Sequence, residues 1–336
     1  MLAPVTSNQT ADLVGEVDPD FLNRATGLLD RVEQELTAAA EADTDFVTAA
    51  ARHIISAGGK RFRPLLVVLA ALLADQPRDD AIVRAALVME LTHVASLYHD
   101  DVMDDADLRR GAASANQRWG NTVAILVGDF LFARASTIVA TLGTEYVDLQ
   151  ARTFARLVQG QIAETRGPAE TANPLEHYLQ VVADKTGSLI AASTTFGGMV
   201  AGLEEPSLAA LAAYGEEIGV VFQLSDDIID IASDTSGKTP GTDLRAGVPT
   251  LPTLLARASV DPADARLLEL LDSDLDSDAD LAEALGLMRA HSAMADARAE
   301  ITRRAEIARG YLAPLPDGEA KAALSALCDA VISRSS

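Results

Sequence analysis

The stretch Leu97-Tyr-His-Asp-Asp-Val-Met-Asp-Asp-Ala-Asp-Leu-Arg-Arg-Gly111 decides the fold predicted for this chain. Upstream of it, apolar residues recur with the period of a buried helix face, at Leu87, Val88, Leu91, Val94, Ala95 and Tyr98. If the helix continues, Asp100 and Asp104 lie one turn apart, with Asp101 on nearly the same face. Like charges so placed repel, and acids oppose the dipole at a helix C-terminus. A helix that ends in this way is a candidate for function.

A second acidic triplet repeats the pattern. Asp226, Asp227 and Asp230 again close an apolar run. Hard divalent cations would relieve the repulsion, because Mg²⁺ takes oxygen ligands and is often shared between carboxylates and phosphates. The plainer interpretation is a solvated acidic surface in a chain of net charge −23, but two copies in similar settings argue against coincidence. We expect the triplets to face one cavity and to hold metal ions that bind a diphosphate.

The composition favours helices throughout. The chain of 336 residues is rich in Ala and Leu and only 4% aromatic, which suits helices packed on helices. No segment alternates like a strand, and no linker divides the chain. We therefore predict an all-α fold, with a flexible tail at 1–17 that has no helical period and a single domain at 18–336.

Charge and cysteine content exclude several classes of function. The negative net charge argues against nucleic acid as a partner. Cys328 is the only cysteine, so there is no internal disulfide and no cysteine-based metal site. The longest strictly apolar run, Leu65 to Ala74, is too short to span a bilayer. We expect no signal peptide, because no apolar core precedes Arg24, the first basic residue. We expect a soluble, cytoplasmic protein.

Two further polar features lie near the first triplet. The turn Gly58-Gly-Lys-Arg-Phe-Arg-Pro64 combines glycines, which allow close backbone approach, with cation donors for a phosphate. A basic turn between helices is an equally good interpretation. His93 lies two turns before Asp100 on the same helix face, so it points toward the cavity, although a lone histidine there is more often a hydrogen-bonded core residue.

From Gly58 to Pro252 the motifs, taken in order, resemble the trans-isoprenyl diphosphate synthase family, the polyprenyl synthetases, of the long-chain type. The resemblance implies an all-α helical bundle around a central active-site cavity. The substrates would be isopentenyl diphosphate and an allylic prenyl diphosphate, and the cofactor would be Mg²⁺, about three ions per site.

The resemblance also assigns roles to residues. On the isopentenyl side it implies contacts from Lys60, Arg63, His93 and Arg110. On the allylic side it implies contacts from Arg109, Lys185, Thr186 and Lys238, with Gln223 just before the second triplet. The implied Mg²⁺ ligands are Asp100, Asp101 and Asp104 in the first triplet and Asp226, Asp227 and Asp230 in the second. One position departs from the family, because Val248 stands where a further lysine is frequent. Either part of the diphosphate contacts is absent, or another cation such as Arg245 supplies them.

The implied reaction starts with cleavage of the allylic carbon–oxygen bond, which leaves a carbocation and pyrophosphate. The isopentenyl double bond attacks the cation, and a proton is then lost to the departing pyrophosphate. Cations must stabilise the leaving group, and water must be kept away.

Product length should follow from the space below the first triplet. Ala95 and Ser96 are small where short-chain members tend to place an aromatic residue. We therefore expect an open tunnel and a product of about C35 to C50, used for quinone side chains. Met89, Phe130 or Phe132 could form its floor.

Three alternatives remain at this point. A class I terpene cyclase is also helical and needs Mg²⁺, but it would not need the Gly-Gly-Lys-Arg turn or a second Asp-Asp-x-x-Asp. A non-catalytic subunit that binds prenyl diphosphates would be marked by degraded aspartates, and both triplets are intact. An acidic helical scaffold would show no prenyl binding. The family further implies a homodimer and transient membrane contact for product release.

Overall fold

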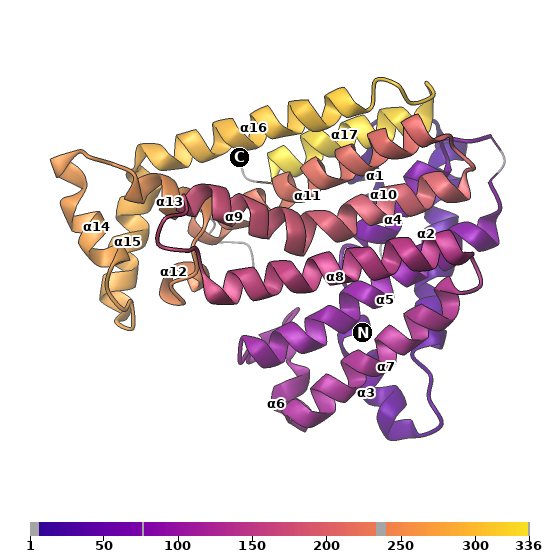
Figure 1. The fold of residues 1–336 in the computed structure, drawn as a ribbon, viewed down its shortest axis with the longest axis horizontal. Helices are drawn as coiled ribbons and strands as arrows, with labels where there is room; N and C mark the ends of the chain where they lie inside the picture. The colour runs from indigo at the N-terminus through magenta and orange to yellow at the C-terminus, as the bar shows by residue number, and fades with distance from the viewer. Residues whose placement is uncertain (1–6, 76, 233–239, 335–336) are drawn as a thin grey trace. The chain divides into compact units, whose positions relative to one another are not determined.

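The computed structural model describes residues 7–75, 77–232 and 240–334 (Figure 1). In this part of the chain the only strands are β1 (Leu108–Arg109) and β2 (Ala112–Ala113), which pair antiparallel, and the rest of the regular structure is helical. The predicted all-α class is therefore confirmed. The chain divides into two compact units, each described here by itself. The prediction of one domain at 18–336 stays a prediction.

Unit 1 contains residues 1–155, 189–215 and 312–327. Its complete elements, besides the hairpin, are α1 (Ser7–Val14), α2 (Pro19–Ala39), α3 (Asp45–Ser56), α4 (Phe62–Ala71), α5 (Asp79–Met103), α6 (Ala115–Trp119) and α7 (Asn121–Val139). It also holds parts of α8 (Thr144–Arg166), α10 (Ser188–Val200), α11 (Glu205–Ala232) and α17 (Glu319–Ser333).

The long helix α5 is the centre of unit 1. It packs on α7, α4 and α2, and its buried residues lie on all sides. A helix that is apolar all round belongs in a core. Gly128 lets α7 come close, because a Cβ there would meet His99 Nε2 at 2.4 Å and Ala95 O at 3.2 Å. Tyr98 ties α5 to α3, since its buried hydroxyl donates to Ala50 O at 2.5 Å. These contacts fix the end of α5 that carries the first acidic triplet.

Helix ends follow the expected signals in two places. Asp18 caps α2 by accepting hydrogen bonds from the backbone of Asp20 and Phe21, and Pro19 occupies the first turn. Helix α3 ends just before Gly58 and Gly59, which both have positive φ, a conformation that glycine adopts easily.

The N-terminal segment differs from the prediction. A tail without helical structure was expected at 1–17, but residues 7–14 form α1. Thr10 and Val14 are buried, and a Cβ at Gly15 would meet Ala326 at 3.0 Å. Packing of a few small residues therefore orders a helix that is too short to give a clear apolar period.

Unit 2 contains residues 156–188, 216–311 and 328–336. Its complete elements are α9 (Pro174–Val182), the π-helical turn η1 (Ala183–Gly187), α12 (Thr242–Arg245), α13 (Leu251–Arg257), the 3₁₀ turn η2 (Pro262–Asp264), α14 (Ala265–Leu271), α15 (Asp278–Ala290) and α16 (Ser292–Tyr311). Helix α13 packs on α16 and α9, and α14 packs on α15. Between α9 and α10, η1 continues the helical path through a wider turn.

Two described helices are long and apolar enough to cross a membrane by length and composition alone. Helix α5 is mostly buried, as a core helix is, whereas only 33% of the apolar window in α7 is buried. The apolar surface of α7 therefore needs its own explanation.

Candidate active site

The first triplet lies at the C-terminal end of α5, in unit 1. Asp101 is fully buried, and its Oδ1 accepts hydrogen bonds from Arg109 Nε and Nη2 at 2.6 Å. The other oxygen, Oδ2, is buried without a hydrogen-bond partner among the described residues. Burial raises the pKa of Asp101 above its ordinary value, although Arg109 opposes that shift. Asp104 forms the exposed C-cap. One carboxylate oxygen in a buried place therefore lacks the cation or donor that it needs.

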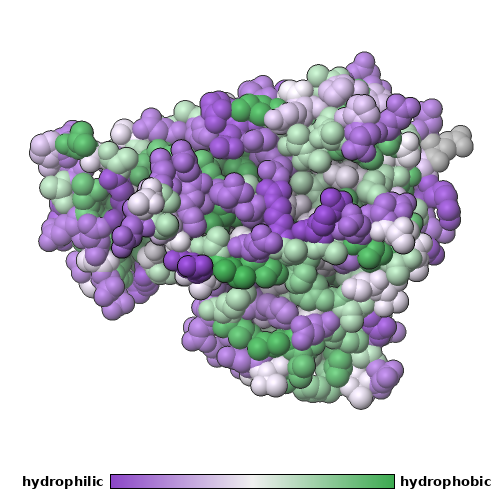
Figure 2. All heavy atoms as spheres, viewed as in Figure 1, coloured by the Kyte–Doolittle hydropathy of each residue, from purple (hydrophilic) through white to green (hydrophobic). Residues whose placement is uncertain are grey.

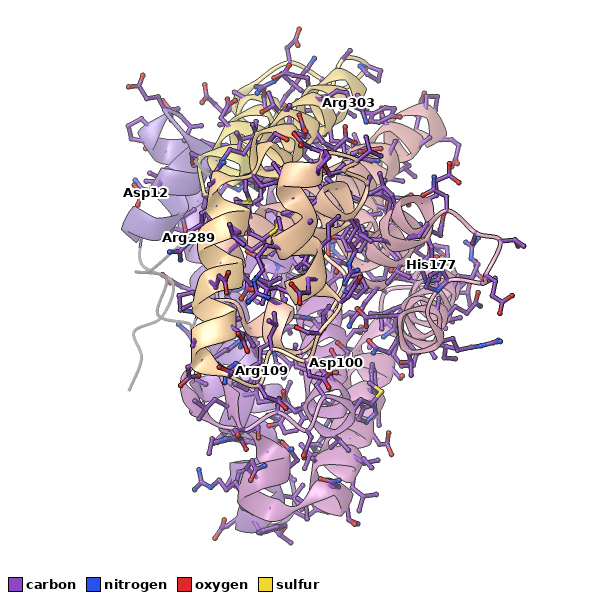
Figure 3. All side chains as sticks on the ribbon, turned by 90° about the vertical axis from the view of Figure 1, so that its left-hand side faces the viewer. Asp12, Asp100, Arg109, His177, Arg289 and Arg303 are labelled. Atoms are coloured by element: carbon purple, nitrogen blue, oxygen red, sulfur yellow. The ribbon has the colours of Figure 1, made fainter. Side chains whose placement is uncertain are left out.

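The hairpin explains how two adjacent arginines reach different places. Arg110 and Gly111 join β1 to β2, and both have positive φ, as a tight two-residue turn requires. Arg109 turns back to the end of α5, where Figure 3 labels it together with Asp100. Arg110 instead donates to the backbone oxygens of Ile54, at 3.1 Å, and Gly58. The hairpin thus links the first triplet to the basic turn.

The basic turn and the neighbouring hairpin bring several positive charges close together. Arg61, in a left-handed conformation at the start of α4, binds Glu33 at 2.6 Å and Glu90 at 3.0 Å. Arg63 Nε is buried and has no partner in the described part of the chain. Burial lowers the pKa of Arg63 to about 10, with Arg110 contributing. Burial also lowers the pKa of Arg110, to which Arg61 and Arg109 add. Such a cluster favours a bound anion.

His93 lies among these cations. Burial is the largest cause that lowers the pKa of His93 well below its ordinary value, and Arg63, Arg110, Arg109 and Arg61 all add to it. The imidazole is therefore neutral at physiological pH, and its ring can donate one hydrogen bond without adding charge. Lys60, predicted as a further contact on this side, is exposed.

The second triplet lies on α11, in unit 2, and its members differ in environment. Asp227 is 2% exposed and accepts hydrogen bonds from Tyr178 Oη, from Leu251 N at 3.1 Å and from Gln223 Nε2 at 3.2 Å. Burial raises the pKa of Asp227 to about 7. To bind a metal ion, this carboxylate would have to give up hydrogen bonds from Tyr178, Leu251 and Gln223. Its predicted role as a metal ligand stays a prediction.

The other two members of the triplet are more accessible. Asp226 pairs with Arg334 Nη2 at 2.6 Å, and the Arg334 guanidinium lies over the ring of Phe222 at 4.5 Å. The carboxylate of Asp230 accepts from the backbone of Thr242 and Asp243, both at 3.2 Å. Asp226 would have to exchange Arg334 for a metal ion, much as Asp101 would have to loosen Arg109.

The predicted lysine–threonine pair lies in η1. Lys185 Nζ contacts Glu164 Oε2 at 2.5 Å, and Thr186 Oγ1 donates to Gln223 Oε1 at 3.4 Å. Gln223 in turn donates to Asp227, so a chain of hydrogen bonds joins Thr186 to the second triplet. Lys238, predicted on the same side, lies outside the described residues. Arg245, the suggested replacement for the lysine absent at Val248, pairs with Asp278.

The residues present fit a hard divalent cation by their chemistry. They are carboxylates, and one buried oxygen of Asp101 has no partner in the described part of the chain. Within the described ranges, however, no three His, Cys, Asp or Glu side chains are arranged to hold a metal ion. Convergence of the two triplets stays a prediction, because they belong to different units.

The residues predicted to govern product length are buried in unit 1. Ala95 is fully buried, and Ser96 donates to His93 O at 2.8 Å. Among the three candidates for a floor, Phe132 stands out. Its ring lies 5.6 Å from His99 and 4.3 Å from Phe154, centroid to centroid. Met89 is fully buried, and Phe130 packs instead under Arg134.

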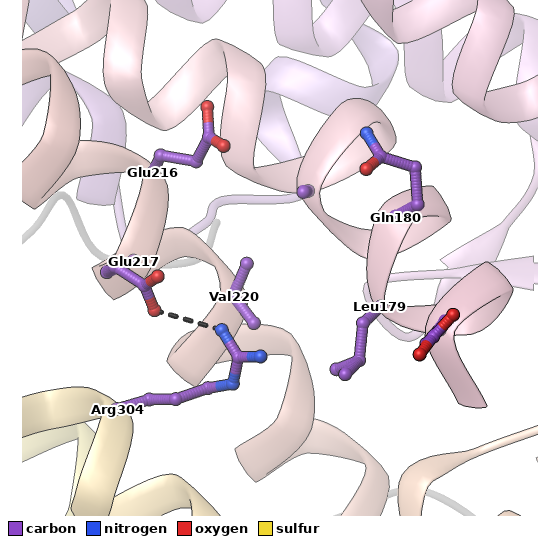
Figure 4. Close-up of a pocket in the computed structure, with 8 residues that line it drawn as sticks. Leu179, Gln180, Glu216, Glu217, Val220 and Arg304 are labelled. Atoms are coloured by element: carbon purple, nitrogen blue, oxygen red, sulfur yellow. Dashed lines mark hydrogen bonds and ion pairs between the residues drawn. The ribbon is translucent and has the colours of Figure 1, made fainter.

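A cavity of about 260 Å³ opens in unit 2 between α9, α11 and α16. Glu217 pairs with Arg304 at 3.1 Å in its wall, whereas Glu216 turns away from that pair (Figure 4). No predicted site residue lines this cavity. It nevertheless adjoins η1, because Ala183 of that turn is one of its lining residues.

Several partners in the site were not visible in the sequence. Tyr178 binds Asp227, Arg156 binds Asp184, and Arg334 binds Asp226. Glu90 was noticeable only as a polar residue on an apolar helix. No local pattern marks the others, because each pair joins residues far apart in the sequence.

The sequence was compared with known protein families. The sequence profile of the polyprenyl synthetase family matches residues 44–288. The chain belongs to this family. The match confirms the expected family and the expected enzyme class, a transferase of prenyl groups.

Individual polyprenyl synthetases agree over nearly the whole chain. The chain is 49% identical to a nonaprenyl diphosphate synthase of Mycobacterium tuberculosis, over 90% of this chain and 91% of that protein. It is 41% identical to a dimethylallyltranstransferase of the same organism, over 94% of each. A geranylgeranyl pyrophosphate synthase structure from Corynebacterium glutamicum, complexed with calcium and isoprenyl diphosphate, aligns with a TM-score of 0.86 at 41% identity, covering 95% and 99% of the two chains. These polyprenyl synthetases carry names that imply different product lengths.

Proposed function

We propose that this polyprenyl synthetase condenses isopentenyl diphosphate with an allylic prenyl diphosphate to form a long all-trans polyprenyl diphosphate. The observation that carries the proposal is the cluster of arginines around a neutral His93. Among the described residues the buried Nε of Arg63 has no hydrogen-bond partner, and burial lowers the pKa of Arg63 to about 10. A diphosphate supplies the missing negative charge and accepts several charge-assisted hydrogen bonds.

The side chains of the site would act by binding and orienting the two substrates. Arg63, Arg110 and His93 would hold the isopentenyl diphosphate, and Arg109, Lys185 and Thr186 the allylic one. Holding the double bond near the allylic carbon turns an encounter of two molecules into a reaction within one complex. Positive side chains around the leaving pyrophosphate stabilise the charge that develops there. The buried apolar residues of α5 and α7 keep water from the carbocation.

We also propose Mg²⁺ as the cofactor, about three ions per site, held by the two aspartate triplets. When bound, it would neutralise diphosphate charge and assist departure of pyrophosphate. The donor set supports this, since the first triplet offers a buried oxygen that has no partner among the residues the structure describes. A solved relative binds calcium and isoprenyl diphosphate, which are chemically similar ligands.

For the product we propose about C35 to C50, used for quinone side chains. Small, buried residues at Ala95 and Ser96 support a tunnel below the first triplet. A relative named nonaprenyl diphosphate synthase supports the same length.

A homodimer is the assembly we propose. The support is α7, where Ile125 is 43% exposed and Leu126 is 60% exposed. Figure 2 has hydrophobic residues at the surface over the part of the molecule where Figure 1 labels α6 and α7. We further propose a cytoplasmic protein that touches the membrane only to release its product.

The decisive experiment incubates the purified protein with Mg²⁺, labelled isopentenyl diphosphate and farnesyl or geranylgeranyl diphosphate, and sizes the products by chromatography. We expect long polyprenyl diphosphates when Mg²⁺ is present and no product when EDTA removes it. A terpene cyclase would convert the allylic diphosphate alone, and a non-catalytic subunit would bind substrate without turnover. Either outcome would overturn the proposal.

A matched pair of variants tests the isopentenyl side. Arg63→Ala should raise the KM for isopentenyl diphosphate by about 10- to 100-fold, because it removes a hydrogen-bonding charge. Arg84→Ala removes an exposed arginine of α5 and should leave that KM unchanged. Equal KM values for the two variants would show that Arg63 does not bind isopentenyl diphosphate.

A further inference from the structure

The turn η1 carries Lys185 and Thr186, and it has the wider π-helical geometry. Such turns are rare and occur mostly inside α-helices at functional sites. Since the geometry is not favoured by the backbone itself, neighbouring contacts must hold it in place. The question is which residues of unit 2 do so.

Arg156 on α8 contacts the turn directly. Its Nε donates to Asp184 Oδ1 at 2.5 Å, and its Nη1 donates to Glu216 Oε2 on α11 at 2.5 Å. Gln180 Nε2 donates to the second oxygen of Asp184 at 2.8 Å. The hydrogen bonds to Glu216 and Asp184 raise the pKa of Arg156 above its ordinary value. A planar guanidinium can bridge two carboxylates in this way, and an ammonium cannot do so with fixed geometry.

The same face of α8 contacts η1 at two further positions. Gly160 lies one turn beyond Arg156, and a Cβ there would meet Lys185 N at 2.7 Å and Asp184 Cβ at 2.9 Å. Glu164 lies one turn further and binds Lys185 Nζ at 2.5 Å. Residues at this spacing form one stripe on a helix. The stripe of Arg156, Gly160 and Glu164 is therefore built against the turn that carries the lysine and threonine.

We propose that Arg156 is a positioning residue for the allylic substrate. It acts through Asp184 and Glu216, which it clamps to α8, so that η1 presents Lys185 and Thr186 in a fixed orientation. Arg156 itself contacts no substrate. The inference rests on the proposed function, because it takes the allylic diphosphate as the ligand of η1.

The test compares Arg156→Ala and Arg156→Lys with the control Arg152→Ala. Arg152 lies one turn earlier on α8 and pairs with Asp148 at 2.6 Å on the exposed surface. We expect Arg156→Ala to lower kcat/KM for the allylic substrate by about 10- to 100-fold, since small displacements of positioning groups have effects of this size. The KM for isopentenyl diphosphate should change less than about twofold. Arg156→Lys keeps the positive charge but loses the forked guanidinium. Its kcat/KM for the allylic substrate should lie between those of the wild type and Arg156→Ala.

A binding readout separates positioning from turnover. Calorimetry with farnesyl S-thiolodiphosphate, which resists cleavage, should show weaker binding to Arg156→Ala and unchanged binding to Arg152→Ala. Asp184→Asn keeps the shape of its side chain and should reproduce the loss even if Arg156→Ala fails to fold. The double variant Arg156→Lys/Asp184→Asn should weaken allylic binding little more than either substitution alone, because both disrupt the same Arg156–Asp184 contact.

The outcomes distinguish the two claims. If the wild-type protein forms no polyprenyl diphosphate, the proposed function fails. If the wild type is active but allylic binding is unchanged in folded Arg156→Lys and Asp184→Asn, the positioning role is overturned. Equal weakening for both substrates would also overturn it, because general destabilisation would then explain the effect.

Discussion

His93 is kept neutral by removal from water and by the arginines around it. Its folded pKa is lowered, so an unfolded chain binds one proton more as the pH falls below the ordinary value of 6.5. The contribution of His93 to stability is therefore present above pH 6.5 and is lost as the pH falls toward the lowered folded pKa.

This dependence predicts the behaviour of His93→Gln. Urea denaturation from pH 8 to pH 5 should give wild-type and variant stabilities whose difference is constant above pH 6.5. Below pH 6.5 the wild type should lose up to about 1.4 kcal/mol per pH unit relative to the variant, because glutamine takes no proton. Parallel curves over the whole range would show that His93 titrates normally.

Among the helices, α5 and η1 show what could be read from the sequence. The apolar period and the acids predicted α5 and its end, because burial imposes a period that the sequence must carry. No local pattern predicted the turn η1, since its support comes from Arg156 and Gly160 on another helix. Motif residues were recognisable because each motif lies within a short stretch of sequence. Their partners, such as Tyr178 at Asp227, are set by tertiary packing that no local pattern records.

The close approach of α8 to η1 can be tested at Gly160. Gly160→Ala places a Cβ 2.7 Å from Lys185 N, a backbone atom that cannot turn away as a side chain would. We expect a loss of about 1 to 3 kcal/mol in the free energy of unfolding, together with a raised KM for the allylic substrate. Gly286→Ala is the control, because a Cβ there meets nothing within 4 Å. It should be neutral or stabilising by up to about 1 kcal/mol. Similar results for both variants would contradict the close approach.

The small residue at Ala95 makes a prediction about product length. Ala95→Phe places an aromatic ring one turn before the first triplet, where it should block a growing chain. We expect the products to shorten to about C20 or less on chromatography. Because Ala95 is fully buried, thermal unfolding must first show that the variant folds. Phe132→Ala should act in the opposite direction, since it removes a ring from the predicted floor. An unchanged product from a folded Ala95→Phe variant would place Ala95 outside the tunnel wall.

For the whole molecule, the remaining problem is the apolar surface of α7. A soluble monomer rarely exposes a contiguous apolar patch without a partner for it. A second copy of the chain is the simplest partner, because a twofold interface uses the same patch on both sides. The sequence revealed only that α7 is apolar. It could not reveal which of its residues lie outside, since that depends on how α7 packs on α5.

Leu126→Asp tests this assembly. A twofold axis brings two copies of the substituted surface together, so one substitution introduces two charges into one apolar interface. We expect light scattering to give twice the mass of one chain for the wild type and the mass of a single chain for the variant. Val260→Asp adds the same charge at a residue that is 96% exposed and outside α7, and it should remain dimeric. If Leu126→Asp also remains dimeric, α7 does not form the interface. If the wild type has the mass of one chain, the exposed face of α7 must serve another partner, and the dimer is wrong.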